Sequence, residues 1–177
     1  QGAAIVICSE ELANTLDVDQ KKRIYPIAAA ENNHMIPSIL RPQLLKQAGM
    51  QMAANFIIDI CKDKDINISY FDLYSCFPVA VQMFADTLGI KDISNSTITG
   101  GMSFAGGPLN SYVLHSTIKM IKKLRKNVNN AGVVTGVSGM MTKQSFALWA
   151  KNPIIEFLHK DFTNEASINE IPIDISS

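Results

Sequence analysis

Two kinds of hydrophobic pattern alternate along this chain. Short apolar runs, either uninterrupted or alternating with polar residues, are typical of β-strands. They predict strands at about residues 3–8, 24–30, 69–74, 96–101, 131–137 and 146–150. Between them lie longer segments in which apolar residues recur at steps of three and four, the period of a helix with one buried face. These segments predict helices at about residues 9–16, 42–63, 78–88 and 108–126.

The order of these segments predicts an α/β fold, because strands that alternate with helices form a mostly parallel sheet with helices on both faces. Residues 31–41 fit neither period and are expected to form an irregular loop. Gly49 is expected to bend or break the long helix, since glycine costs about 1 kcal/mol relative to alanine inside a helix. Residues 1–152 are interpreted as one domain, and residues 153–177 as an extension that is able to add an edge strand.

Composition narrows the class of protein. The chain has 177 residues with 16 basic and 16 acidic side chains, so its formal net charge of zero argues against a nucleic-acid or polybasic membrane-binding surface. Cys8, Cys61 and Cys76 are odd in number and widely spaced, which argues against a disulfide framework or a zinc site and favours a reducing, cytoplasmic location. No apolar run approaches the length of a membrane span. Because Gln1-Gly2 leads directly into an apolar run, we expect the chain to be a fragment of a longer protein.

Candidate chemistry gathers where three predicted strands end, since the carboxyl ends of parallel strands meet at one edge of a sheet. The first segment, 74–78, contains Cys76 at a predicted helix N-terminus, where a lowered thiol pKa would favour a nucleophile or an acid. The alternative is a small buried residue at a strand–helix junction. The second segment, 97–110, carries two double glycines before Pro108 and resembles a strand–helix turn that binds an anion through free N–H groups. Glycines that serve only packing are the alternative.

The third segment, 135–143, offers backbone N–H groups from Gly136, Ser138 and Gly139 to an oxyanion, unless it is an ordinary β-turn. His115 lies one to two turns into the helix predicted after this glycine-rich segment. It either faces the cleft or covers the surface. No cluster of residues predicts a metal site or a bound cofactor.

Taken in order, these segments resemble the C-terminal half of a thiolase, and more closely the thiolase-like proteins described as acetyl-CoA acetyltransferases. The opening run Gln1-Gly2-Ala3-Ala4-Ile5-Val6 is similar to the strand that begins this half. Residues 71–78 (FDLYSCFP) match the position of the Asn-Glu-Ala-Phe loop, 100–108 match the GGAIAxGHPxG loop, and 135–140 match the CxGGGxG loop. The resemblance covers residues 1–150.

The resemblance implies a half-domain with a five-stranded mixed sheet, stacked on a similar N-terminal half, and acyl transfer between CoA thioesters in a dimer. The chain departs from the family at each catalytic position. Gly107 stands where thiolases have the histidine, Gly136 where they have the cysteine, and Tyr74 and Ser75 where they have Asn and Glu. Cys76, two positions later, is a candidate substitute acid or thiol, with Ser75 as a second candidate and His115 as a third. Tyr74, Gly106, Gly107, Gly136, Ser138 and Gly139 would contact the substrate.

Two classes of function follow. The longer protein is either an acyltransferase acting on acyl-CoA thioesters, or a non-catalytic module that keeps the thiolase frame to bind acyl-CoA, a lipid or a partner protein. In both cases this chain alone is expected to be inactive. It is also expected to expose an apolar face and to associate with the N-terminal half or with itself.

Overall fold

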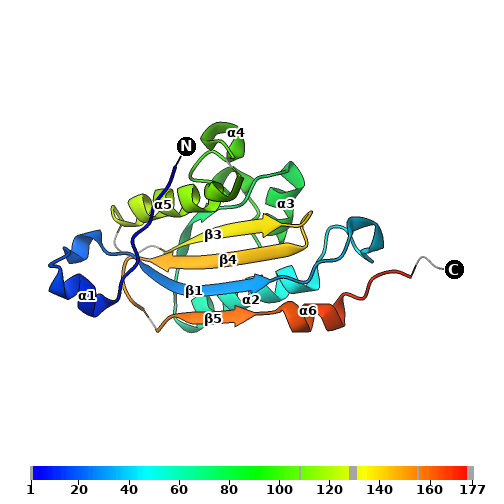
Figure 1. Cartoon of the computed structure of the whole chain (residues 1–177), viewed down its shortest axis with the longest axis horizontal. Coiled ribbons are helices and arrows are strands. Elements are labelled where there is room, and N and C mark those ends of the chain that lie inside the picture. Colours follow the sequence, from blue (N-terminus) through cyan, green and yellow to red (C-terminus); the bar gives the residue numbers. More distant parts are fainter. Residues whose placement is uncertain (1, 108, 128–130, 155, 175–177) are drawn as a thin grey trace.

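The computed structural model describes residues 2–107, 109–127, 131–154 and 156–174. A five-stranded sheet in the order β2-β3-β4-β1-β5 forms its centre (Figure 1). The strands are β1 (Tyr25–Asn32), β2 (Ile68–Asp72), β3 (Ala131–Ser138), β4 (Lys143–Ala150) and β5 (Leu158–Asp161). The α-helices are α1 (Glu10–Thr15), α2 (Ala48–Asp63), α3 (Pro78–Thr87), α4 (Met102–Ala105), α5 (Tyr112–Leu124) and α6 (Thr163–Asn169). Short 3₁₀ turns lie at Gln20–Lys22, Ser38–Leu40, Ile93–Asn95 and Leu109–Ser111.

The strand directions confirm a mostly parallel mixed sheet. β2 is parallel to β3 and β1 is parallel to β5, whereas β4 is antiparallel to both of its neighbours. Among the strands of the described residues, β4 therefore runs opposite to the other four. The carboxyl ends of β1, β2, β3 and β5 consequently share one edge of the sheet, which is where the sequence predicts the functional loops.

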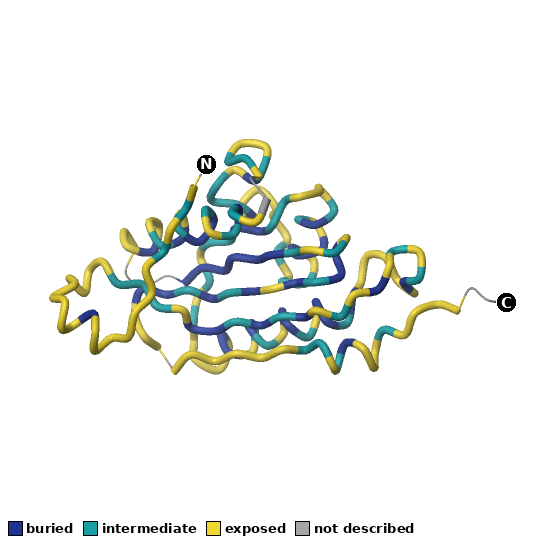
Figure 2. Tube along the Cα trace, in the orientation of Figure 1, coloured by how far each residue is buried: buried dark blue, intermediate teal, exposed yellow. Residues whose placement is uncertain are grey.

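Helices cover both faces of the sheet, as predicted. α2 and α3 pack behind it in the view of Figure 1, and α5 packs on the front over β3. Successive residues of β3 serve opposite faces, because strand side chains alternate: Val133 joins the large core under α2 and α3, and Val134 joins a smaller core with Met120 and Leu124 of α5. Figure 2 shows the buried residues concentrated along these central strands.

Two predicted strands are wrong. Residues 3–8 are all described and form no strand; Val6 and Ile7 are 93% and 79% exposed. An apolar run pairs as a strand only where another strand offers free backbone groups, and this run lies beside no such edge within the described chain. Residues 96–101 also form no strand, since their N–H groups bond to the Asp72 carboxylate and to hydroxyl groups in place of a sheet ladder.

The long helix also begins later than predicted. α2 begins at Ala48, and residues 42–46 before it are exposed. Gly49 is the second residue of α2 and does not bend the helix. It allows α2 to approach β1 closely, because a Cβ at this position would lie 2.3 Å from Cγ of Asn32. The predicted helix over 108–126 corresponds to the 3₁₀ turn and α5, and Pro108 lies outside the described residues.

The segment after residue 152 completes the sheet. β5 adds the predicted edge strand beside β1, in a register that pairs Ala28 with Leu158. α6 follows it and packs against α2, with Ala166 buried. Among the described residues, no helix combines the length and the apolar character needed to cross a membrane.

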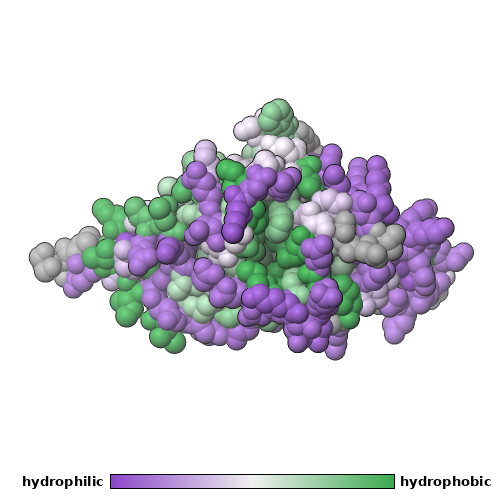
Figure 3. All heavy atoms as spheres, turned by 180° about the vertical axis from the view of Figure 1, so that it is seen from behind, coloured by the Kyte–Doolittle hydropathy of each residue, from purple (hydrophilic) through white to green (hydrophobic). Residues whose placement is uncertain are grey.

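Exposed apolar side chains gather at one end of the molecule. Figure 3 shows them at the end where the C-terminal segment lies, while hydrophilic residues dominate the opposite end. The largest are contributed by the 35–45 loop and the C-terminal segment: Met35, Ile39, Leu44, Leu45, Ile168 and Ile171, which are 59–78% exposed.

Candidate functional site

A fully buried carboxylate organises the edge of the sheet where the predicted site lies. Asp72 is the last residue of β2 and is 0% exposed. Its Oδ2 accepts hydrogen bonds from the backbone N–H groups of Ile98 (3.0 Å) and Thr99 (2.9 Å). Its Oδ1 accepts from the hydroxyl groups of Tyr112 (3.2 Å) and Ser116 (3.0 Å) on α5. Asp72 thus joins the end of β2, the glycine-rich segment and α5.

The glycine-rich segment satisfies its own N–H groups. The hydroxyl oxygen of Thr97 accepts from the N–H groups of Gly100 and Gly101, both at 3.0 Å. The hydroxyl oxygen of Ser75 accepts from the N–H of Met102 at the start of α4, at 2.9 Å. The sequence predicts that N–H groups of this segment bind an anion. In the structure, these three N–H groups already donate to hydroxyl groups of the protein.

The second pair of glycines closes α4. Gly106 has a positive φ of 78°, a conformation that favours glycine, and its N–H donates to the carbonyl of Met102. Gly107, which the resemblance stated from the sequence aligns with the thiolase histidine, lies beside the Met102 side chain. The backbone bends as a glycine-rich turn should, but this position supplies no base.

The segment after Asp72 places Tyr74 and Ser75 inward and Cys76 outward. The N–H of Tyr74 donates to the Thr135 hydroxyl at 2.9 Å, which ties this loop to β3. The ring of Tyr74 meets the ring of Tyr112 edge to face, with 5.4 Å between their centres. Burial raises the pKa of the Tyr74 hydroxyl, and the neighbouring Cys76 and Tyr112 add to this effect.

Cys76 immediately precedes Phe77, the N-cap residue of α3. The residue as a whole is exposed, yet surrounding atoms desolvate its sulfur. This desolvation raises the pKa of the Cys76 thiol, and the opposing effect of the Phe77 and Cys76 N–H groups is smaller. The lowered thiol pKa expected from a helix N-terminus is therefore wrong for Cys76 in this chain.

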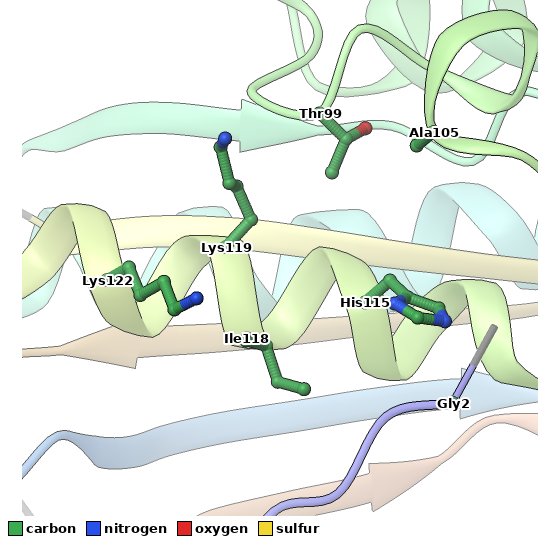
Figure 4. Close-up of a pocket in the computed structure, with 7 residues that line it drawn as sticks. All are labelled: Gly2, Thr99, Ala105, His115, Ile118, Lys119 and Lys122. Carbon is green, nitrogen blue, oxygen red and sulfur yellow. The ribbon is translucent and has the colours of Figure 1, made fainter.

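Two hollows flank α5. The first, of about 460 Å³, is lined by Gly2, Thr99, Ala105, His115, Ile118, Lys119 and Lys122 (Figure 4). His115 therefore lines a hollow next to the glycine-rich segment. Its Nε2 atom is buried and finds no hydrogen-bond partner in the described protein.

The second hollow, of about 260 Å³, lies over the β3 and β4 ends and is lined by Glu31, Asn33, Val113, Gly136, Val137, Ser138, Lys143, Gln144 and Ser145. Gly136 and Ser138, two of the residues predicted to contact substrate, line it. Gly139 follows with a φ of +59°, and its carbonyl accepts from the Thr142 N–H at 3.2 Å, which defines the β3–β4 turn.

The predicted residues thus lie along one edge of the sheet but not in one cluster. Tyr74 and Ser75 lie with the glycine-rich segment, His115 lines one hollow, and Gly136 and Ser138 line the other. Among the described hydrogen bonds, none joins Cys76 to His115, so these two side chains do not form a thiol–imidazole pair of the kind that activates a nucleophile. No group of three or more metal-ligating side chains occurs within the described residues.

Sequence reasoning missed Asp72. The signal that could have found it is an acid at the end of an apolar strand, combined with Thr97, Thr99, Tyr112 and Ser116 further along the chain. Two of these hydroxyl groups lie on the strand predicted at 96–101 and two in the first half of the helix predicted at 108–126, so a buried carboxylate between these elements would be able to accept from them.

No protein-family model matches the chain, and no curated protein matches it. Among solved structures, the chain is similar to a monomeric SCP2-thiolase-like protein type 1 from Mycobacterium smegmatis. The TM-score is 0.71 and the sequence identity 26%, over 81% of this chain and 32% of the other. This chain has a thiolase-like fold. It spans about a third of the length of that relative, and the resemblance stated from the sequence is confirmed at the level of the fold.

Proposed function

We propose that this chain is the C-terminal half-domain of a thiolase-like protein that acts on acyl-CoA thioesters. The observation that supports the proposal most is the similarity to an SCP2-thiolase-like protein over 81% of the chain. The placement of Tyr74, Ser75 and Gly136 at one edge of the sheet also supports it, since strand-end loops bear the sites of α/β folds.

Within this proposal the chain contributes binding surface more than reacting groups. The raised pKa of the Cys76 thiol keeps it protonated near neutral pH, and a thiol is a much poorer nucleophile than a thiolate. Gly107 and Gly136 stand at the positions of the family histidine and cysteine. We therefore expect the acyl-accepting nucleophile to come from the N-terminal half of the longer protein. This domain would pack against that half, whether the whole protein is a monomer or a dimer.

A non-catalytic acyl-CoA or lipid-binding module is the second candidate. The hydrogen bonds of the glycine-rich segment favour this second candidate. The hydroxyl oxygens of Thr97 and Ser75 already accept from the backbone N–H groups of Gly100, Gly101 and Met102. An oxyanion hole needs such donors to be free.

The test is acetyl-CoA binding by calorimetry together with thioester turnover, measured on this chain and on the longer protein. The chain alone is expected to bind acetyl-CoA without turning it over. The longer protein is expected to turn over the thioester if it is a transferase, and only to bind it if it is a binding module. Cys76→Ser and Ser75→Ala are compared with Cys8→Ser, which replaces the other exposed thiol among the three cysteines. Failure of both proteins to bind acetyl-CoA would overturn the proposal.

A further inference from the structure

One face of α5 presents a basic stripe to the hollow shown in Figure 4. His115, Lys119 and Lys122 follow one another at steps of four and three residues, so they share one side of the helix. Thr99, from the glycine-rich segment, and Ile118, from α5, complete the lining and add a hydroxyl and an apolar side chain to it. The hollow measures about 460 Å³, within the size range of small-molecule sites.

The charge in this hollow is unbalanced. Among the described residues that line it, none is acidic. Neither Lys119 nor Lys122 forms an ion pair within the described part of the chain. Other lysines do have partners: Lys160 pairs with Glu165 at 2.9 Å, and Lys123, on another side of α5, lies over the ring of Tyr70. Two ammonium groups without a counter-charge attract an anion.

His115 adds an unsatisfied polar atom. Its Nε2 is buried without a hydrogen-bond partner in the described protein, whereas most buried polar atoms have one. An imidazole N–H is a good donor to a phosphate oxygen. His115 lines the hollow, so a phosphate group bound there would offer its imidazole an acceptor.

The walls of the hollow are held in place. Ser116, the neighbour of His115, is fully buried and donates to Asp72, and the hydroxyl groups of Thr99 and Tyr112 lie 2.9 Å apart. Asp72 therefore fixes α5 relative to the segment that carries Thr99. Preformed walls reduce the ordering cost of binding.

We propose that this hollow binds a phosphate-bearing group, and, resting on the function proposed above, that this group is the phosphate portion of the CoA thioester. Lys119 and Lys122 neutralise the phosphate charge, the imidazole of His115 donates to one of its oxygens, and Ile118 contacts an apolar part of the ligand. The acyl end then extends toward the loops at the strand ends.

The test measures binding of acetyl-CoA, S-acetylpantetheine and inorganic pyrophosphate to the chain and to the double variant Lys119→Ala/Lys122→Ala. Lys126→Ala, in the turn that directly follows α5 and outside the hollow, is the control. The double variant is expected to bind acetyl-CoA and pyrophosphate at least about tenfold more weakly, with S-acetylpantetheine unchanged. Binding to the unmodified chain should weaken as salt is raised from 50 to about 300 mM. His115→Ala should weaken pyrophosphate binding more than His115→Gln, which keeps an N–H donor.

The outcomes separate the two proposals. If acetyl-CoA and S-acetylpantetheine bind equally well and the lysine substitutions change neither, this inference is overturned while the proposed function stands. Pyrophosphate binding that depends on both lysines, without binding of either thioester by the chain, overturns the assignment of this phosphate to CoA, while the proposed function is decided by acetyl-CoA binding to the longer protein. Unchanged circular dichroism spectra of the variants are required for each comparison.

Discussion

Ser116 on α5 donates a hydrogen bond of 3.0 Å to the carboxylate of Asp72 at the end of β2, and both residues are fully buried. This bond crosses 44 positions of the sequence and joins a helix to a strand end. Asp72 receives further bonds from the backbone of Ile98 and Thr99. Removal of the Asp72 carboxylate would leave these N–H and hydroxyl donors without their acceptor.

Asp72→Ala is therefore expected to lower the free energy of unfolding by about 3 kcal/mol or more, because each unsatisfied buried donor costs about 1–3 kcal/mol. Asp72→Asn should cost less, since its oxygen still accepts from the backbone and the hydroxyl groups are able to rotate toward its amide. Urea denaturation measures both. Asp59→Ala, at an acid whose side chain is 72% exposed, serves as the control and should change stability little. Equal stability of Asp72→Ala and wild type would contradict this role.

Gly49 permits the close approach of α2 and β1. A Cβ there would lie 2.3 Å from Cγ of Asn32, whose amide is held by the Thr142 carbonyl and the Gln144 side chain. Gly49→Ala should therefore destabilise the fold by about 2 kcal/mol through overpacking, despite the better helix propensity of alanine. Thermal unfolding of this variant is compared with Gly2→Ala, where a Cβ would meet nothing within 4 Å. A gain in stability for Gly49→Ala would show that the Asn32 side chain moves freely.

Cys61, buried on α2, makes stability depend on pH. Burial raises the pKa of its thiol to about 11, whereas an unfolded cysteine titrates near about 8.5. The folded state holds this proton more strongly, so its contribution to stability is complete below the unfolded pKa and is lost as pH rises through about 11.

Between pH 8.5 and 11 the wild type should therefore lose stability relative to Cys61→Ala, by an amount on the order of 3 kcal/mol. Tyrosines and lysines that titrate in the same range are common to both proteins, so the difference isolates Cys61. Parallel curves for the two proteins over this range would exclude the effect.

Self-association should depend on the exposed N-terminal run. Val6 and Ile7 are 93% and 79% exposed in a segment that forms no strand within the described part of the chain, and an exposed apolar run of this kind favours edge-to-edge pairing. Sedimentation velocity at rising concentration should show association of this chain, and Val6→Glu/Ile7→Glu should reduce it. The control is Ala4→Ser, a substitution in the same segment that adds no charge. A strictly monomeric chain at high concentration would contradict the expectation.

Much of the fold follows from local pattern. Pro78 begins α3, and Gly89, which follows its last turn, adopts a φ of +71°, as expected of a glycine that ends a helix. The apolar run after residue 130 forms β3. In these segments the local signal and the tertiary environment agree.

The failures have long-range causes. Thr97-Ile98-Thr99 resembles a strand because its residues are β-branched, but Asp72 binds its N–H groups from 27 positions earlier. Residues 3–8 have strand composition without a neighbouring edge in the described chain. The strand pattern places the candidate residues at one edge of the sheet, as the structure has them. Their separation into two hollows depends on the position of α5 over the sheet, which the hydrogen bonds to Asp72 fix. The roles of Cys76, Ser75 and the glycines in substrate contact stay predictions.

The hydroxyl groups of Thr97 and Ser75 hold Gly100, Gly101 and Met102 without help from any ligand. Hydrogen bonds within the protein therefore hold the conformation of this loop, which does not depend on a bound substrate. Side chains on this loop are therefore replaceable without a change in its backbone conformation. The variant Gly107→His would therefore place an imidazole on a loop that already holds its shape, which makes this chain a starting point for designing an active site.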